Sequence, residues 1–91
     1  MSSAWRVEFD DRAARDLKSI GPAAEREVVR YLLKRIAGPA DPRRFGKPLG
    51  RDLHGLWRWR VLDYRIIGEI QDGVLLVLVV RIGHRKDVYD F

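Results

Sequence analysis

Basic side chains alternate along one short segment of the chain, and a second basic cluster, RIGHRKDVYDF, ends it. In the segment LWRWRVL, a β-strand would place Arg58 and Arg60 on one face and Trp57 and Trp59 on the other. No acidic residue shares the arginine face of this segment, whereas a face that needs only solubility usually mixes Lys, Glu and Thr. Fixed positive charges on one face suit a polyanion, and RNA is the leading candidate.

The composition supports acidic partners. The 91-residue chain has 18 Lys and Arg against 13 Asp and Glu, which gives a net charge of +5. This excess favours nucleic acid, an acidic protein segment or an anionic membrane surface. A hydrophobic content of 46% and a charged content of 34% indicate one folded, soluble domain over residues 1–91.

Several classes of site are excluded or not expected. The chain has no cysteine, so disulfides and thiolate metal sites are excluded. His54 and His84 lie too far apart in the sequence for a zinc-ligand spacing, and we expect neither a metal nor a cofactor. The longest apolar run, 74–80, is too short to span a bilayer, and the N-terminus does not resemble a signal peptide. A cytoplasmic location is therefore expected, without a membrane partner.

The elements that must position the arginines begin with a strand and two helices. WRVEF at 5–9 predicts a strand, and Asp10 or Asp11 can cap the helix that follows. The Gly-Pro pair at 21–22 predicts the end of this helix and the start of another, which runs to about Ala37. The expected apolar stripe of the second helix consists of Val28, Val29, Leu32, Leu33 and Ile36. Its expected basic row consists of Arg26, Arg30 and Lys34.

The second half of the sequence predicts a β-sheet. Residues 38–55 are rich in Gly and Pro and are expected to be irregular. Three strands follow, at 56–62, 64–70 and 74–82. The Asp-Gly pair at 72–73 predicts a hairpin, and the apolar run VLLVLVV predicts a strand inside the sheet. The fold class is therefore α+β in the order β-α-α-β-β-β, with a helical hairpin on one face of an antiparallel sheet.

This order of elements accompanies four motifs: GKPL, an R-x-R strand, D-Y-R-I and G-H-R-x-D-V-Y. Together, in this order and spacing, they resemble the RelE toxins of bacterial toxin–antitoxin pairs, within the RelE/ParE superfamily. The resemblance covers essentially the whole chain. It implies the RelE-like fold and a ribosome-dependent endoribonuclease that cuts mRNA codons in the A site. It also implies that the attacking group is the 2′-hydroxyl of the RNA, without a metal, and that a cyclic phosphate is left.

The resemblance assigns roles to individual residues. Arg65 would stabilise the transition-state phosphate, although a cross-strand pair with Glu69 or Asp63 is an alternative. Tyr89 would be the general base or a surface that stacks on a nucleobase. Arg85 would be the general acid or a phosphate clamp, and His84 could take part of the proton transfer or be a surface residue. Arg81 is expected to be structural.

The remaining basic residues would bind RNA. Arg58 and Arg60 correspond to positions that are lysines in the best-known RelE sequences, and arginine is a poor general base, so both are expected to bind phosphate. The expected contacts to ribosomal RNA are Lys47, Arg51, Arg43 and Arg44, with a basic loop that has no partner as the alternative. The connection after the R-x-R strand is shorter than in those relatives, as is the spacing from Arg85 to Tyr89.

Two other functions remain possible at this level. A ParE-like protein would share the fold and inhibit DNA gyrase without cleaving RNA, although the GHRKDVY tail favours the RelE type. A ribosome- or RNA-binding module without catalysis is the second alternative. All three candidate functions predict a cognate antitoxin that forms a hetero-oligomer with this chain. An acidic or amphipathic segment of the antitoxin would lie across the basic face or the helices.

Overall fold

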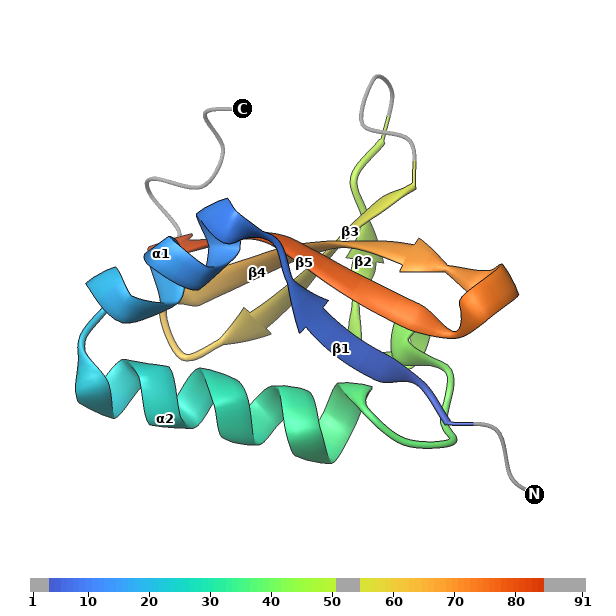
Figure 1. Ribbon diagram of the computed structural model, residues 1–91, viewed down its shortest axis with the longest axis horizontal. Coiled ribbons are helices and arrows are strands. Elements are labelled where there is room, and N and C mark those ends of the chain that lie inside the picture. Colours follow the sequence, from blue (N-terminus) through green and yellow to red (C-terminus); the bar gives the residue numbers. More distant parts are fainter. Residues whose placement is uncertain (1–3, 51–54, 85–91) are drawn as a thin grey trace.

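The computed structural model describes residues 4–50 and 55–84, which form a five-stranded sheet and two helices (Figure 1). The elements are β1 (Arg6–Phe9), α1 (Asp11–Ser19), α2 (Pro22–Tyr31), a π-helical turn (Leu32–Ile36), a 3₁₀ segment (Pro42–Phe45), β2 (Lys47–Pro48), β3 (Leu56–Val61), β4 (Tyr64–Gln71), a 3₁₀ turn (Asp72–Val74) and β5 (Leu76–His84). The predicted α+β class and element order are confirmed, and β2 adds a short strand inside the region expected to be irregular. None of the helices in the described part of the chain is long and apolar enough to cross a membrane.

The helix boundaries follow from local chemistry. The Asp10 side chain accepts a hydrogen bond from the backbone N–H of Ala13 at 2.8 Å and caps α1. Gly21 then adopts φ 95°, a left-handed conformation that favours glycine, and Pro22 begins α2. The predicted cap and the predicted Gly-Pro boundary are therefore confirmed.

The second helix buries a narrower stripe than the sequence predicts. Val28, Leu32 and Ile36 are buried, whereas Val29 is half-buried and Leu33 is 65% exposed. Residues four apart form one ridge of a helix, and the ridge of Val28, Leu32 and Ile36 lies in the core. Assigning Leu33 to the core was wrong because it lies on the neighbouring ridge.

The sheet has the strand order β1-β5-β4-β3-β2, in which β1 is parallel to β5 and the other neighbours are antiparallel. The apolar strand β5 lies inside the sheet, as predicted. It begins two residues later than expected because residues 72–74 form a 3₁₀ turn and Leu75 adopts φ 51°. Val74 is consequently 58% exposed and lies outside the strand.

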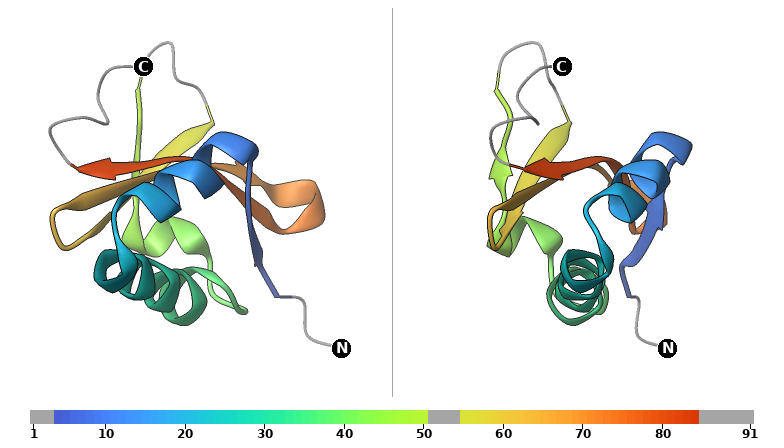
Figure 2. Two further views of the ribbon diagram at one scale, coloured as in Figure 1. Left: turned by 60° about the vertical axis from the view of Figure 1, so that its left-hand side comes forward. Right: turned by 90° about the vertical axis from the view of Figure 1, so that its left-hand side faces the viewer.

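Tryptophans anchor the core between the sheet and the helices. Trp59 is fully buried, and its Nε1 donates a hydrogen bond to the carbonyl oxygen of Pro42 at 2.9 Å. Trp5 is 8% exposed, and Trp57 packs against the same cluster. All three tryptophans of the chain therefore lie in or against the core. The core also takes side chains from both helices, so α1 and α2 cover the same face of the sheet (Figure 2).

The Asp16 carboxylate binds the edge of β5 beyond the end of its pairing with β1. The pairing of β1 with β5 stops at Val79. Beyond it, Asp16 of α1 accepts a hydrogen bond from the backbone N–H of Ile82 at 3.0 Å and from Arg81 Nε at 3.2 Å. The Arg81 side chain is only 13% exposed, which confirms its predicted structural role. This contact holds α1 against the last residues of β5.

Candidate nucleic-acid interface

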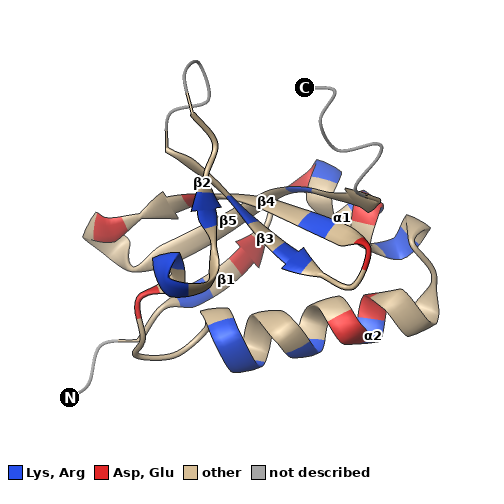
Figure 3. Cartoon of the chain, turned by 180° about the vertical axis from the view of Figure 1, so that it is seen from behind, with Lys and Arg blue, Asp and Glu red and all other residues tan. Residues whose placement is uncertain are grey.

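Strand register brings four basic side chains together at one corner of the sheet. Lys47 of β2 pairs with Arg58 of β3, and Arg60 of β3 pairs with Arg65 of β4. Residues paired across strands lie on the same face, as do residues two apart on one strand. We call these four residues the basic corner. Trp59 alternates with Arg58 and Arg60 and lies in the core, so the basic corner is on the face away from the helices (Figure 3).

Like charges face each other directly in this corner. Paired side chains on antiparallel strands have Cβ atoms about 4.5–5.5 Å apart, and opposed like charges destabilise a sheet. Arg60 is exposed and forms no ion pair with any residue in 4–50 or 55–84. A bound anion between the two strands would relieve this repulsion, which favours a phosphate site.

The surface beneath the basic corner is apolar and partly shielded from solvent. Ile67 is only 1% exposed although it lies on this face, and its cross-strand neighbours are Arg58 and Arg81. The Nε atoms of Arg58 and Arg65 are shielded from solvent. Charges near low-dielectric surroundings act more strongly on a bound anion than charges in open water.

The register corrects two expectations about acidic neighbours. The residues directly opposite Arg65 are Arg60 and Gly83, so pairing across the strands with Glu69 or Asp63 is wrong. The face is also not free of acid, because Glu69 pairs across the strands with Leu56 on the same side. Its carboxylate accepts a hydrogen bond from Gln71 at 2.8 Å and lies farther along β4 than Arg65.

His84 lies on the other face from the arginines. It pairs with Tyr64, whose neighbour on that face of β4 is the core residue Ile66. The rings of Tyr64 and His84 meet edge to face, with centroids 6.0 Å apart. Arg60 and Arg65 occupy the opposite face, so this arrangement does not support the predicted proton transfer by His84 at a phosphate held there.

Three predicted site residues, Arg51, Arg85 and Tyr89, lie outside the described residues, and their roles stay predictions. Gly83, near the end of β5, lies opposite Arg65, and residue 85 follows His84 in the sequence. In residues 4–50 and 55–84, no three His, Asp or Glu side chains gather as a metal site would require.

The 3₁₀ segment holds its two arginines differently. Arg43 donates hydrogen bonds to Asp72 at 2.6 Å and to Asp41 at 3.3 Å, and its guanidinium lies 5.7 Å from the ring of Trp57. The hydrogen bond from Arg43 lowers the pKa of the Asp72 carboxyl. Arg43 therefore ties this segment to the β4–β5 turn, whereas Arg44 is exposed and available to a partner.

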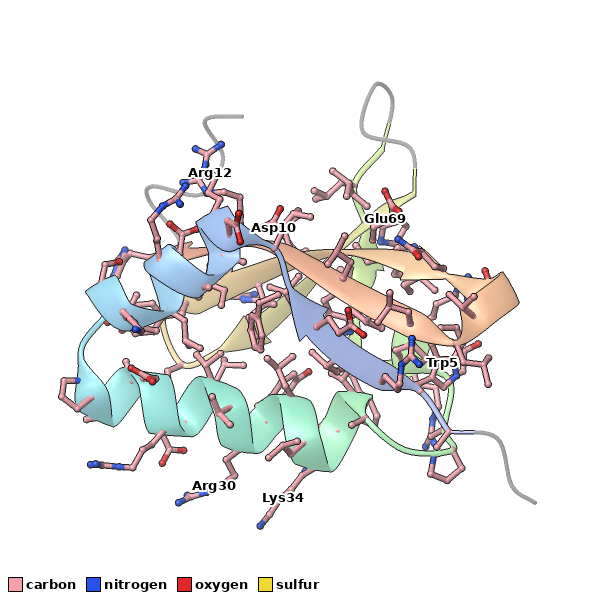
Figure 4. All side chains as sticks on the ribbon, in the orientation of Figure 1. Trp5, Asp10, Arg12, Arg30, Lys34 and Glu69 are labelled. Atoms are coloured by element: carbon pink, nitrogen blue, oxygen red, sulfur yellow. The ribbon has the colours of Figure 1, made fainter. Side chains whose placement is uncertain are left out.

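A groove runs along the outer side of α2. Its volume is ≈ 460 Å³, and it is lined by Glu25, Arg26, Val29, Arg30, Leu33 and Lys34. Arg30 and Lys34 extend away from the sheet (Figure 4). The sequence pattern identified the basic row but assigned Val29 and Leu33 to the core. An exposed apolar floor with charged sides is typical of a protein-binding surface.

Comparison with known proteins agrees with this geometry. A family model described as the ParE toxin of the type II toxin–antitoxin system parDE matches residues 7–89. Toxin RelG of Mycobacterium tuberculosis is 34% identical over 85 residues, which cover 93% of this chain and 95% of that protein. Toxin RelE of the same organism is 33% identical, with coverage of 93% and 86%.

Solved structures show the same relationship. The RelBE2 toxin–antitoxin complex of M. tuberculosis contains a chain with a TM-score of 0.81 and 34% identity, covering 91% of this chain and 93% of that one. A mutant of E. coli RelE in the free state has a TM-score of 0.75 at 19% identity, with coverage of 96% and 90%, and supports the fold alone. The chain therefore belongs to the ParE toxin family of type II toxin–antitoxin systems and is a toxin of the RelE type within the RelE/ParE superfamily.

Proposed function

We propose that this toxin is a ribosome-dependent endoribonuclease that cuts mRNA in the A-site codon. The observation that carries the proposal is the basic corner, where two cross-strand pairs of like charges lie on the face without helices. Such a concentration of positive charge on one face favours the binding of an anion. A polyanion with a phosphate at each nucleotide supplies that anion, and the family membership makes mRNA on the ribosome the substrate we propose.

The proposed reaction is attack by the 2′-hydroxyl of the RNA on the adjacent phosphate. The P–O bond to the 5′-oxygen breaks, the 2′-oxygen takes its place, and a 2′,3′-cyclic phosphate results. The reaction needs a base for the 2′-proton, an acid for the leaving oxygen and positive charge near the phosphorane. Arginine stays protonated, so Arg60 and Arg65 would neutralise charge rather than accept a proton.

Proton transfer in this proposal falls to the C-terminal stretch. Tyr89 is the proposed base, and its ordinary pKa of ~10 requires nearby guanidinium groups to lower it. Arg85 is the proposed phosphate clamp, with the acid role as its alternative. Arg58 and Lys47 would hold the RNA backbone, and Arg51 and Arg44 would contact ribosomal RNA.

The partner that we propose inhibits the toxin is a cognate antitoxin. Related structures contain RelE-type toxins bound to RelB-type antitoxins. The groove on α2 offers an exposed apolar residue, Leu33, between Arg26, Arg30 and Lys34. An amphipathic, acidic helix would match both the apolar floor and the positive sides.

The test uses purified ribosomes programmed with a defined mRNA and an empty A site, read by primer extension. Wild type is expected to cut within the A-site codon and to leave free mRNA intact. Arg65→Ala and Tyr89→Phe should each reduce the cleavage rate more than they reduce ribosome binding, because both act in the transition state. Equal losses in rate and affinity would contradict these assignments.

Two further variants separate binding from chemistry. Arg58→Ala should weaken binding and lower its salt dependence, and an unchanged salt slope would argue against a phosphate contact. Arg6→Gln is the matched control, because Arg6 is an exposed strand arginine whose Nη2 lies 3.7 Å from the carboxylate of Glu8. A wild-type protein that arrests growth without cutting would instead support the gyrase-binding or pure binding alternative.

A further inference from the structure

An aromatic ring gathers two cations beside the basic corner. The guanidinium carbon of Arg44 lies 5.2 Å from the ring centroid of Phe45, and that of Arg35 lies 5.5 Å from it. Arg35 comes from the π-helical turn after α2, whereas Arg44 and Phe45 belong to the 3₁₀ segment. Two elements that are separate in the sequence thus bring their positive charges to one ring. We call these three residues the Phe45 cluster.

Structural stabilisation alone explains this cluster incompletely. One cation over an aromatic ring contributes about 0.5–1 kcal/mol at an exposed site. A second cation near the same ring brings two like charges together, which offsets part of that gain. Both arginines are exposed, and the ring is 37% exposed. The 3₁₀ segment is already held by Arg43 and by the hydrogen bond between Trp59 and Pro42.

The chain positions the cluster next to the proposed RNA surface. Only Gly46 separates Phe45 from Lys47 of the basic corner. Gly46 packs closely against Trp59, since a Cβ built on Gly46 would lie 2.7 Å from Trp59 Nε1. The connection between the two basic groups therefore has little room to shift. Figure 3 shows the basic residues of the 3₁₀ segment beside those of β2 and β3 in one view.

We propose that the Phe45 cluster is a second RNA-binding site, which contacts ribosomal RNA outside the codon being cut. Arg35 and Arg44 would bind backbone phosphates, and the Phe45 ring would hold the two guanidinium groups in position. This inference rests on the proposed function and deepens it. The cluster would contribute to ribosome affinity and leave the chemical step unchanged, because it lies beyond the basic corner.

The test measures affinity for ribosomes programmed with an mRNA that carries a 2′-deoxynucleotide in the A-site codon. This mRNA lacks the attacking hydroxyl and should stay intact. Arg35→Gln, Arg44→Gln and Phe45→Ala should each weaken binding about 5- to 10-fold near 0.1 M salt, and each arginine variant should lower the salt slope by about 0.7–0.9. Phe45→Tyr retains the ring and should bind like wild type. Arg12→Gln, an exposed arginine on α1 (Figure 4), is the matched control and should also bind like wild type.

Single-turnover cleavage at saturating protein and thermal unfolding complete the test. Unchanged cleavage rates with weakened binding would support the proposal. Unfolding at a lower temperature combined with wild-type affinity would overturn it, because the cluster would then only hold the 3₁₀ segment. If wild type itself fails to bind ribosomes, the proposed function falls and this site with it. If wild type binds ribosomes and Arg35→Gln, Arg44→Gln and Phe45→Ala bind as tightly as wild type, the inference is refuted while the proposed function stands.

Discussion

Replacing Arg60 by glutamine should stabilise the fold and weaken RNA binding at the same time. Arg60 lies directly opposite Arg65 and has no ion pair within the described residues. Removing its charge should relieve repulsion in the free protein and remove the proposed phosphate contact in the complex. Replacing an ordinary surface arginine would show neither effect. A gain in stability together with a loss of RNA affinity would therefore identify a site that binds an anion.

The expected gain in stability can be worked from the register. Two unit charges about 6 Å apart in water repel by ~0.7 kcal/mol, and opposed cross-strand pairs typically contribute about 0.2–1 kcal/mol. Because Arg60 is exposed, the high-dielectric figure applies. A domain of this size gains about 4–8 °C per kcal/mol, so the variant should unfold about 2–6 °C above wild type. The loss of one charged hydrogen bond to phosphate, about 1.5–3 kcal/mol, should weaken binding ~10- to 150-fold.

The assay is thermal unfolding at low salt and at 1 M salt, paired with ribosome binding. At 1 M the screening length falls to about 3 Å, so the difference in unfolding temperature between Arg60→Gln and wild type should nearly vanish. Arg6→Gln is the control, because Arg6 faces the carboxylate of Glu8. Its loss should leave stability unchanged or slightly lower, and should leave ribosome binding unchanged.

Two results would contradict this role of Arg60. If Arg60→Gln unfolds at a lower temperature than wild type, Arg60 makes a stabilising contact and the repulsion argument is wrong. If the variant is stabilised but binds and cleaves like wild type, the opposed charges in the basic corner are not a phosphate site.

Three other perturbations test the fold and its connections. Gly46→Ala should destabilise the protein by about 1–3 kcal/mol in chemical denaturation, because the added Cβ would lie 2.7 Å from Nε1 of the buried Trp59. Stability equal to that of wild type would show that the indole moves aside. Asp16→Asn should lower the unfolding temperature and speed amide exchange at the end of β5, and unchanged exchange would contradict that contact. Arg43 holds the pKa of Asp72 below its usual range, so the ion pair stabilises the fold above about pH 4 and loses its effect as the pH falls. Asp72→Asn should therefore unfold earlier than wild type at pH 7 and match it near pH 2; a gap that persists at pH 2 would mean another cause.

Local signals in the sequence predicted most of the architecture. The Asp10 cap, the Gly-Pro boundary at 21–22 and the alternation of Trp and Arg in β3 each depend on neighbouring residues alone. Alternation also predicted that Arg58 and Arg60 share a face. Period and capping are local properties, so a single chain displays them.

Features that depend on contacts between distant segments were missed. The apolar pattern of α2 does not indicate how wide a stripe the sheet covers, so Leu33 was assigned to the core. Alternation does not indicate which residue lies opposite on the neighbouring strand. The pairing of Arg60 with Arg65 is therefore known only from the strand register. The contact of Asp16 with β5 and the meeting of Arg35 with Phe45 have no signal in the sequence.

We propose that this chain cuts ribosome-bound mRNA through the RNA's own 2′-hydroxyl. The most direct test compares an all-ribose mRNA with one that carries a single 2′-deoxynucleotide at the cut position, each on ribosomes with an empty A site. We expect a cut in the A-site codon of the first mRNA, with a 2′,3′-cyclic phosphate end, and no cut in the second. Cleavage of both mRNAs at the same rate, or of neither, would contradict it.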